Sequence, residues 1–250
     1  PHRVCPSEKS EGPFQIIDGI GFHEVVITRD HERSIADMTE SEIGLILRAY
    51  VERSVSVKSE TCIEYVLIFH NHGPKAGASV FHPHSQLIAL PIIPPDVARS
   101  LEGSRKYFER NKACVHCAIL NFELKEKTRV IYENDDFTAL CPFASRVSFE
   151  IRIYPKKHDA HFRNIKPEAI ISLAAVLEKA LKKLQVAVNN PDYNFFIHTA
   201  PVKSGDADHY HWHIEILPRL DIWAGLELGT GIEVVAVAPE EATAMLRDAA

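Results

Sequence analysis

The segment His82-Pro83-His84-Ser85-Gln86 has a counterpart 127 residues further along the chain (82 to 209, 84 to 211), which reads His209-Tyr210-His211-Trp212-His213. The same offset aligns further residues without a gap over about seventy positions. The aligned pairs are Phe22 and Phe149, His31 and His158, Phe69 and Phe196, Pro91 and Pro218, with Asn71 on His198. Three histidines at preserved spacings are improbable as a coincidence in a chain of 14 histidines. We interpret the chain as two copies of one structural unit, which are too few for a solenoid.

Both copies predict the same order of elements: strand, helix, strand, loop and strand. The strands are expected at residues 22–28, 64–70 and 84–90 and again at 149–154, 193–198 and 211–217, where β-branched and aromatic residues predominate. Thr39 and Glu42 form a capping box before the first helix, and Pro167 suits the first turn of the second helix.

The remaining segments complete the prediction of an α+β fold with antiparallel sheets. Residues 92–147 connect the copies and should contain a helix around residues 96–109 and two short strands, and a last helix should follow Pro239. We expect two tandem domains, residues 1–105 and 106–250, each an antiparallel sheet with helices packed on it.

The composition is that of a globular protein outside the membrane. Of the 250 residues, 46% are hydrophobic and 25% are charged, and the formal net charge is −6. This charge is opposite to the lysine and arginine excess of non-specific nucleic-acid binders. No apolar run approaches the roughly 20 residues that span a bilayer, and the first residues lack an apolar signal core. We expect a cytoplasmic protein without nucleic-acid or membrane partners.

The five cysteines predict free thiols and one metal site. An odd number of cysteines with one C-x-x-C, from Cys114 to Cys117, is atypical of a secreted disulfide framework. A C-x-x-C with histidines downstream is typical of tetrahedral zinc. The alternative is a pair of buried thiols in a turn.

The histidine segments predict chemistry, because alternate residues of a strand share one face. His82, His84 and Gln86 should therefore project together, as should the three histidines at 209, 211 and 213. Clustered imidazoles are costly to desolvate without partners, which argues against a role as polar filler.

These features resemble the galactose-1-phosphate uridylyltransferase family, the double-domain branch of the histidine-triad superfamily. H-P-H-S-Q before an apolar strand is the most specific feature of a resemblance that covers roughly residues 20–235. Further matching segments are Asp30-His31, Asn71 to Gly73, Gly77-Ala78-Ser79, Pro142-Phe143, Phe149-Glu150, Pro155 to His158 and Gly225-Leu226-Glu227.

The resemblance implies a ping-pong reaction in which His84 attacks the α-phosphorus of a nucleotide sugar and carries the nucleotide covalently. Neutral imidazole is a good nucleophile near pH 7, and the carbonyl of His82 is expected to fix its tautomer. Gln86 would donate to a phosphoryl oxygen, and glutamine there favours transfer over hydrolysis. His211, in the matching position of the second copy, is the alternative nucleophile. Asn71, Gly77 and Ser79 match the loop that contacts nucleotide ribose and phosphates.

For metals, the resemblance implies a closed structural zinc site. Its ligands would be Cys114, Cys117, His158 and His211, with His209 as a rival of His211. A first-copy site would use His31 and His82, but its C-x-x-C would precede residue 1, and Cys5 alone does not replace it. Either that pair lies before the given sequence or the first site is degraded. The glutamate that an iron-type site requires in some members has no match around Ser100.

The resemblance leaves the substrates open. The uridylyltransferase reaction, which exchanges UMP between UDP-glucose and galactose 1-phosphate, is the leading hypothesis. Ser85 stands where the common motif has glycine and resembles the ADP-glucose phosphorylases, which use inorganic phosphate as acceptor. A zinc-stabilised nucleotide-binding protein without turnover is a third hypothesis. Gly225 and Glu227 match a sugar-binding segment that completes the partner's active site, which implies a homodimer.

Overall fold

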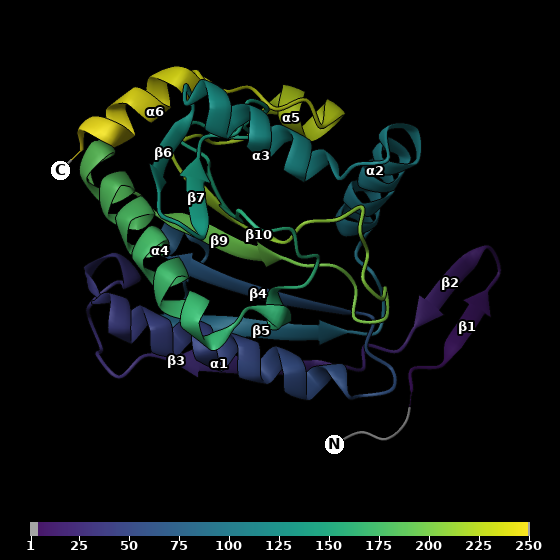
Figure 1. The fold of residues 1–250 in the computed structure, drawn as a ribbon. Coiled ribbons are helices and arrows are strands. Elements are labelled where there is room, and N and C mark those ends of the chain that lie inside the picture. Colours follow the sequence, from purple (N-terminus) through teal and green to yellow (C-terminus); the bar gives the residue numbers. More distant parts are fainter. Residues whose placement is uncertain (1–4, 250) are drawn as a thin grey trace.

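The computed structural model describes residues 5–249, in which eight strands form one antiparallel sheet (Figure 1). The strand order is β3-β5-β4-β9-β10-β8-β7-β6. The bounds are β3 Phe22–Ile27, β4 Tyr65–His72, β5 His84–Leu90, β6 Val130–Glu133, β7 Phe137–Leu140, β8 Ile151–Pro155, β9 Tyr193–His198 and β10 His213–Pro218. The first copy supplies β3, β5 and β4, and the second supplies β9, β10 and β8 in the mirrored order.

The two copies are joined by the antiparallel pairing of β4 with β9. Phe69 pairs with Phe196, and Ile68 pairs with Ile197. Phe69 and Phe196 are also equivalent positions of the repeat, so an approximate twofold axis passes through this pair. The sheet is therefore continuous across the copies.

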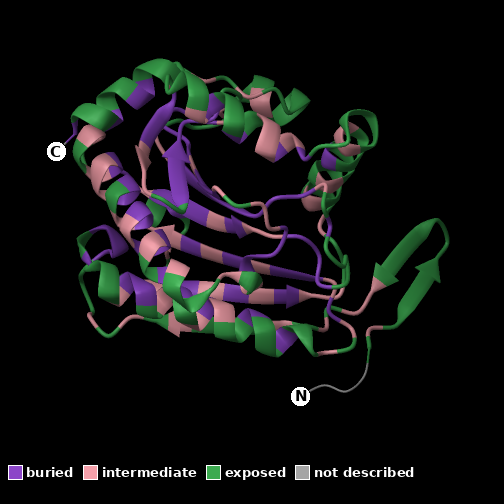
Figure 2. Cartoon of the chain, viewed as in Figure 1, coloured by how far each residue is buried: buried purple, intermediate pink, exposed green. Residues whose placement is uncertain are grey.

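Two long helices cover one face of the sheet. α1 (Glu40–Lys58) and α4 (Pro167–Ala187) pack against each other, and most of the buried apolar core lies between them and the strands (Figures 1 and 2). The capping box expected at Thr39 is present, with its hydroxyl accepting from the Glu42 amide, and Pro167 is the first residue of α4. Local sequence signals thus set the start of both helices.

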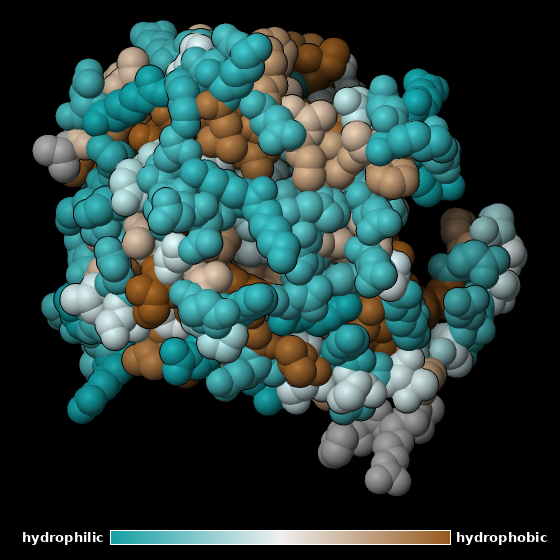
Figure 3. All heavy atoms as spheres, viewed as in Figure 1, coloured by the Kyte–Doolittle hydropathy of each residue, from teal (hydrophilic) through white to brown (hydrophobic). Residues whose placement is uncertain are grey.

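The remaining elements surround this unit. They are β1 (Glu8–Glu11) and β2 (Phe14–Ile17) in a separate hairpin, α2 (Pro95–Asn111), α3 (Val115–Glu126), α5 (Gly225–Thr230), α6 (Pro239–Asp248), and short 3₁₀ turns η1 (Ile35–Asp37), η2 (Pro74–Ala76) and η3 (Phe162–Asn164). The surface in Figure 3 is mainly hydrophilic, and its apolar side chains form small separate patches. The α+β class with antiparallel pairing is confirmed. The expected domain division at residue 105 falls inside α2, and the two-domain description stays a prediction.

Two local expectations are wrong. His209 and His211 precede β10 instead of lying on it, because the backbone there bonds elsewhere: the Trp212 amide donates to the carbonyl of Asp159. The three imidazoles of the second copy therefore do not share one strand face. His82 likewise lies before β5.

The expectation of free thiols is wrong for one pair. Cys5 and Cys62 form a disulfide with their Cα atoms 5.3 Å apart, while the other three cysteines are free. The two residues are 57 positions apart in the chain, and no local pattern in the sequence indicates that they meet.

A buried polar group lies behind β5. The hydroxyl of Tyr50 donates to Oγ of Ser85 (2.5 Å), and Nδ1 of His70 lies 3.1 Å from the same oxygen. All three side chains are buried, so the Tyr50 hydroxyl, the Ser85 hydroxyl and Nδ1 of His70 depend on one another for hydrogen bonds. Desolvation lowers the pKa of His70 from 6.5 to about 3.

We expect His70 to make the stability of the protein sensitive to acid. Its pKa in the folded state is below the unfolded value, so the unfolded chain binds more protons between about pH 3 and 6.5. The stability is complete above pH 6.5 and is lost as the pH falls through this window. Urea unfolding at pH 7 and pH 5 should show that wild type loses about 2 kcal/mol more than His70→Gln, which cannot titrate. Equal losses in the two proteins would contradict a neutral buried His70.

Candidate active site and metal centre

His84 is the first residue of β5 and lies on the face of the sheet opposite the core. Ser85, Leu87 and Ala89 are buried on the helix side, whereas His84 and Gln86 are half-buried on the other side. Nδ1 of His84 lies 2.9 Å from the carbonyl oxygen of His82. A carbonyl can only accept, so in the neutral ring Nδ1 carries the proton and Nε2 has the lone pair. The hydrogen bond expected at this histidine is present.

The turn before β5 is fixed by contacts with the end of β3. Thr28 donates from its amide and its hydroxyl to the carbonyl of Pro83 (3.2 and 2.8 Å), and Nε2 of His82 donates to the carbonyl of Thr28 (2.8 Å). These bonds hold the backbone that carries His84. The ring of His31 lies 4.5 Å from that of His82. The two histidines expected at a first metal site are therefore neighbours, and that site stays a prediction.

Gln86 has a partner that the sequence did not indicate. Its Oε1 accepts a hydrogen bond from Nε2 of His23 on β3 (2.7 Å). With Oε1 engaged in this way, the amide nitrogen of Gln86 remains free to donate on the face that carries His84. His23 occurs in an ordinary alternating strand, and its role depends on the register of β3 against β5.

The end of β4 and the loop after it contain the residues expected to contact the nucleotide. Asn71 lies in β4 on the same face as Gln86, and Gly77 and exposed Ser79 follow η2. Gly73 and Gly77 both have φ of +82°, and a Cβ on Gly73 would lie 2.1 Å from the Asp192 carboxylate. Only glycine suits position 73. The carboxylate of Asp192 accepts from the Lys75 amide (2.5 Å), so the second copy holds this loop.

A cavity of about 410 Å³ lies beside this loop. Its walls include Asn71, His72, Gly73, Phe81, His82 and Asp192.

The residues expected to bind sugar lie elsewhere. Gly225 and Glu227 are in α5, which Figure 1 shows at the opposite end of the sheet from β5. The carboxylate of Glu227 accepts from the Ala224 amide (2.9 Å). The neighbouring apolar side chains are exposed: Ile222 by 94% and Leu228 by 72%. One chain thus does not bring α5 to His84.

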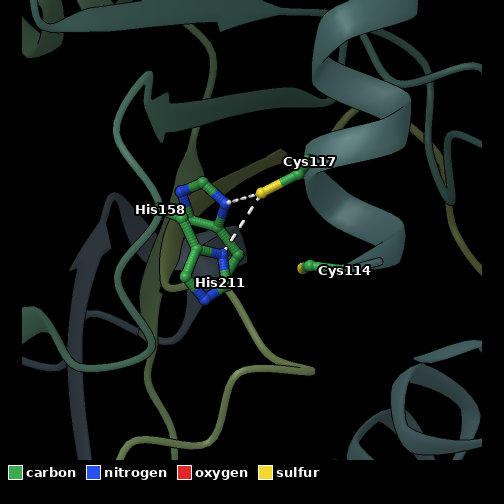
Figure 4. A group of neighbouring side chains, drawn as sticks. All are labelled: Cys114, Cys117, His158 and His211. Carbon is green, nitrogen blue, oxygen red and sulfur yellow. Dashed lines mark hydrogen bonds between the residues drawn. The ribbon is translucent and has the colours of Figure 1, made fainter. Parts of the chain in front are cut away.

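A metal-binding cluster lies between the segment that connects the copies and the second copy (Figure 4). It consists of Cys114, Cys117, His158 and His211, whose ligand atoms all lie within 4.8 Å of one another. Sγ of Cys117 is 3.2 Å from Nδ1 of His158 and 3.4 Å from Nδ1 of His211. Such separations suit two ligands of one tetrahedral ion with bonds of about 2.0 to 2.3 Å. The hydrogen bond from Cys117 holds the pKa of Cys114 well below its usual value, which favours a thiolate.

The rest of the second-copy face is occupied by a buried charge network. Arg152 donates to Glu150 (2.7 Å) and Glu215 (2.9 Å), and Glu215 also contacts Nε2 of His198 (3.0 Å). His213, at the position that matches Gln86, is buried, and desolvation lowers its pKa well below the usual value. His211 itself is fully buried. The two copies therefore differ at the positions that correspond to His84 and Gln86.

Family models match both halves of the chain. The model of the galactose-1-phosphate uridyl transferase N-terminal domain matches residues 6–94, and the HIT domain model matches residues 123–220. An ADP-glucose phosphorylase from Arabidopsis thaliana is 37% identical over 97% of this chain and 68% of its own length. A galactose-1-phosphate uridylyltransferase from Thermotoga maritima is 32% identical over 96% of this chain and 78% of its own length. The chain belongs to the galactose-1-phosphate uridylyltransferase family.

Solved structures of the family have the same fold. The crystal structure of an ADP-glucose phosphorylase from Arabidopsis thaliana with bound ADP-glucose superposes with a TM-score of 0.88 and 37% identity, over 94% of this chain and 76% of that one. A uridylyltransferase structure gives a TM-score of 0.91 and 30% identity, over 99% of this chain and 82% of that one. The family resemblance indicated by the histidine segments is thus confirmed, in a family of nucleotidyltransferases and phosphorylases. None of the described helices is long and apolar enough to cross a membrane.

The cluster predicts metal binding that depends on Cys117. Elemental analysis of purified wild type should find a transition metal in stoichiometric amount, and Cys117→Ala should lose it because one of four ligands is missing. Cys141→Ala is the matched control, since Cys141 is a buried free thiol outside the cluster. Full metal content in Cys117→Ala, or an equal loss in Cys141→Ala, would show that the cluster is not the site.

Proposed function

We propose that this protein transfers a nucleotide from a nucleotide sugar to a phosphate-bearing acceptor through a covalent intermediate on His84. The observation that carries the proposal is the contrast between the two equivalent histidines. His84 has a free Nε2 on a half-buried face, whereas His211 is fully buried within a metal-binding cluster. This contrast favours the first copy as the site of chemistry.

The reaction proceeds in two displacements. Nε2 of His84 attacks the α-phosphorus, a P–N bond forms, and the bond from that phosphorus to the bridging oxygen breaks to release the sugar 1-phosphate. An oxygen of the acceptor phosphate then attacks the same phosphorus and releases His84. The carbonyl of His82 keeps the proton on Nδ1 and stabilises positive charge on the ring. The Gln86 amide donates to a non-bridging oxygen in both steps, because His23 occupies its carbonyl oxygen.

Two substrate pairs are candidates. ADP-glucose with inorganic phosphate is favoured by the 37% identical relative, whose name is ADP-glucose phosphorylase, and by Ser85, which replaces the glycine of the common uridylyltransferase motif. UDP-glucose with galactose 1-phosphate, the leading hypothesis from sequence, is supported by the 32% identical uridylyltransferase. We therefore favour the phosphorylase reaction for this protein.

We propose zinc as the metal of the cluster formed by Cys114, Cys117, His158 and His211. Two thiol and two imidazole ligands match the preference of zinc, and a site with four protein ligands has no open position for substrate. Bound zinc would supply folding free energy. The four side chains would fix α3 against the loops that follow β8 and precede β10.

Rate measurements with both substrate pairs test the proposed reaction. His84→Ala should lower the transfer rate about 10³-fold or more, because the nucleophile is missing. His209→Asn is the matched control: it removes the histidine equivalent to His82 in the second copy, outside the metal cluster, and should keep wild-type activity. Substantial activity in His84→Ala would overturn the assignment. Nucleotide binding by wild type without turnover of either pair would favour a binding protein.

We further propose that a homodimer completes the active site, with Gly225 and Glu227 of one chain contacting the sugar held by the other. The exposed Ile222 and Leu228 beside them suit an interface. Mixing His84→Ala with Glu227→Ala chains under subunit exchange should restore activity up to about one quarter of wild type, since a random mixture forms half heterodimers, each with one intact site. Mixed dimers without activity would show that each chain builds its own site.

A further inference from the structure

Asn194 has a buried side-chain amide that joins the second copy to the loop after β4 of the first copy. We call this loop, residues 73–79, the substrate loop. It lies in β9 directly opposite Asn71 of β4 and is 4% exposed. Its Nδ2 lies 2.7 Å from Oδ1 of Asn71 and 2.8 Å from the carbonyl oxygen of Ala76. Its Oδ1 lies 2.6 Å from Nε of Arg219. Every hydrogen-bonding atom of the Asn194 side chain therefore has a partner.

The donor at Arg219 fixes the orientation of this amide. A guanidinium can only donate, so the atom of Asn194 that faces it must be the oxygen. The nitrogen of Asn194 must then face the opposite way, where the Ala76 carbonyl can only accept. Arg219 and the Ala76 carbonyl therefore require the same orientation of the Asn194 amide. The reversed orientation would place a donor against the Arg219 donor and an acceptor against the Ala76 carbonyl.

The same argument extends one step further to Asn71. Both hydrogens of the Asn194 amide are donated, one of them to Asn71, so the side-chain oxygen of Asn71 must face Asn194. The nitrogen of Asn71 then points away from β9. It donates to none of the described residues 5–249. It lies at the substrate loop, where a Cβ added to Gly77 would be 4.0 Å from it.

The first copy has no equivalent residues that would support the second copy in the same way. The repeat offset places Asn194 on Leu67 and Arg219 on Ile92 (194 − 127 and 219 − 127), and Asn71 on His198. Neither leucine nor isoleucine can orient a polar group. The second copy thus supplies polar support to the first copy, which carries His84, and receives none of this kind in return.

We propose that Asn194 and Arg219 are positioning residues that set the direction of the Asn71 amide, so that its N–H groups point at a phosphate or ribose oxygen of the nucleotide sugar. This inference rests on the proposed function of the His84 site. Arg219 orients Asn194, and Asn194 orients Asn71. Only Asn71 contacts the substrate.

Asn194→Asp tests the proposal because it keeps the shape and removes the donor. The introduced carboxylate still accepts from Arg219, but Asn71 must now turn its nitrogen toward that carboxylate and its oxygen toward the substrate. The dissociation constants of the nucleotide sugar and its nucleoside diphosphate should rise about 10- to 100-fold, as for loss of a hydrogen bond to a charged group. Asn134→Asp is the matched control, since the Asn134 amide donates to the Ser172 carbonyl (2.8 Å) away from this site. It should bind like wild type.

A double-mutant cycle separates orientation from general damage to the loop. If Asn194 acts through Asn71, Asn71→Ala with Asn194→Asp should bind no more weakly than Asn71→Ala alone. Arg219→Met should weaken binding, and Arg219→Lys, which keeps a donor, should restore most of it. Additive losses in the double variant, or wild-type affinity in Asn194→Asp, would overturn the proposal.

The affinity for the nucleotide and the formation of the covalent adduct are measured separately. A wild type that binds the nucleotide without forming a covalent adduct would refute the proposed reaction, while the binding cycle would still decide the role of Asn194. Normal adduct formation together with unchanged affinity in Asn194→Asp would refute the positioning role alone. A wild type that binds neither ADP nor UDP, free or as the sugar derivative, would refute both.

Discussion

The pairing of β4 with β9 is the contact on which the rest of the molecule depends. It places Phe69 opposite Phe196, two equivalent positions of the repeat, and so makes one sheet from two copies. A sheet formed in this way has no unpaired edge at its centre. It also brings the second copy within hydrogen-bonding distance of the loop that follows β4, through Asp192 and Asn194.

On this nearly symmetric framework the two copies have diverged in chemistry. In the first copy, His84 starts a strand and its ring is oriented by a carbonyl bond that leaves Nε2 free. In the second copy, the chain joins β10 only after His211, whose ring lies next to the two cysteines at the start of α3. Burial of an imidazole among thiols suits metal binding, whereas a nucleophile needs access to phosphorus. The proposed nucleophile and the proposed metal ligand thus occupy the same position of the repeat, and they differ in where the following strand begins.

The parts of this arrangement that depend on local sequence could be predicted, and those that depend on register could not. Thr39 and Pro167 signal helix starts by capping chemistry that acts within one turn. The histidine spacing indicated the repeat, and the C-x-x-C together with the family resemblance indicated the metal cluster. The contact of His23 with Gln86 requires the register of β3 against β5. Asn194 gave one usable signal, a polar residue between Tyr193 and Phe195 in a buried strand. Its partners, however, come from β4, from the turn after β4 and from beyond β10. The Cys5–Cys62 bond joins segments without any shared pattern.

The central claim is that chemistry resides in the first copy alone, and the position of the covalent nucleotide tests it most directly. Wild type would be incubated briefly with ADP-glucose or UDP-glucose, digested with trypsin at neutral pH to preserve the P–N bond, and analysed by mass spectrometry. Cleavage after lysine and arginine separates residues 76–99, which contain His82 and His84, from residues 204–219, which contain His209, His211 and His213. We predict that the mass of one nucleotide appears on the 76–99 peptide, with fragmentation placing it on His84. A nucleotide on the 204–219 peptide would contradict the account.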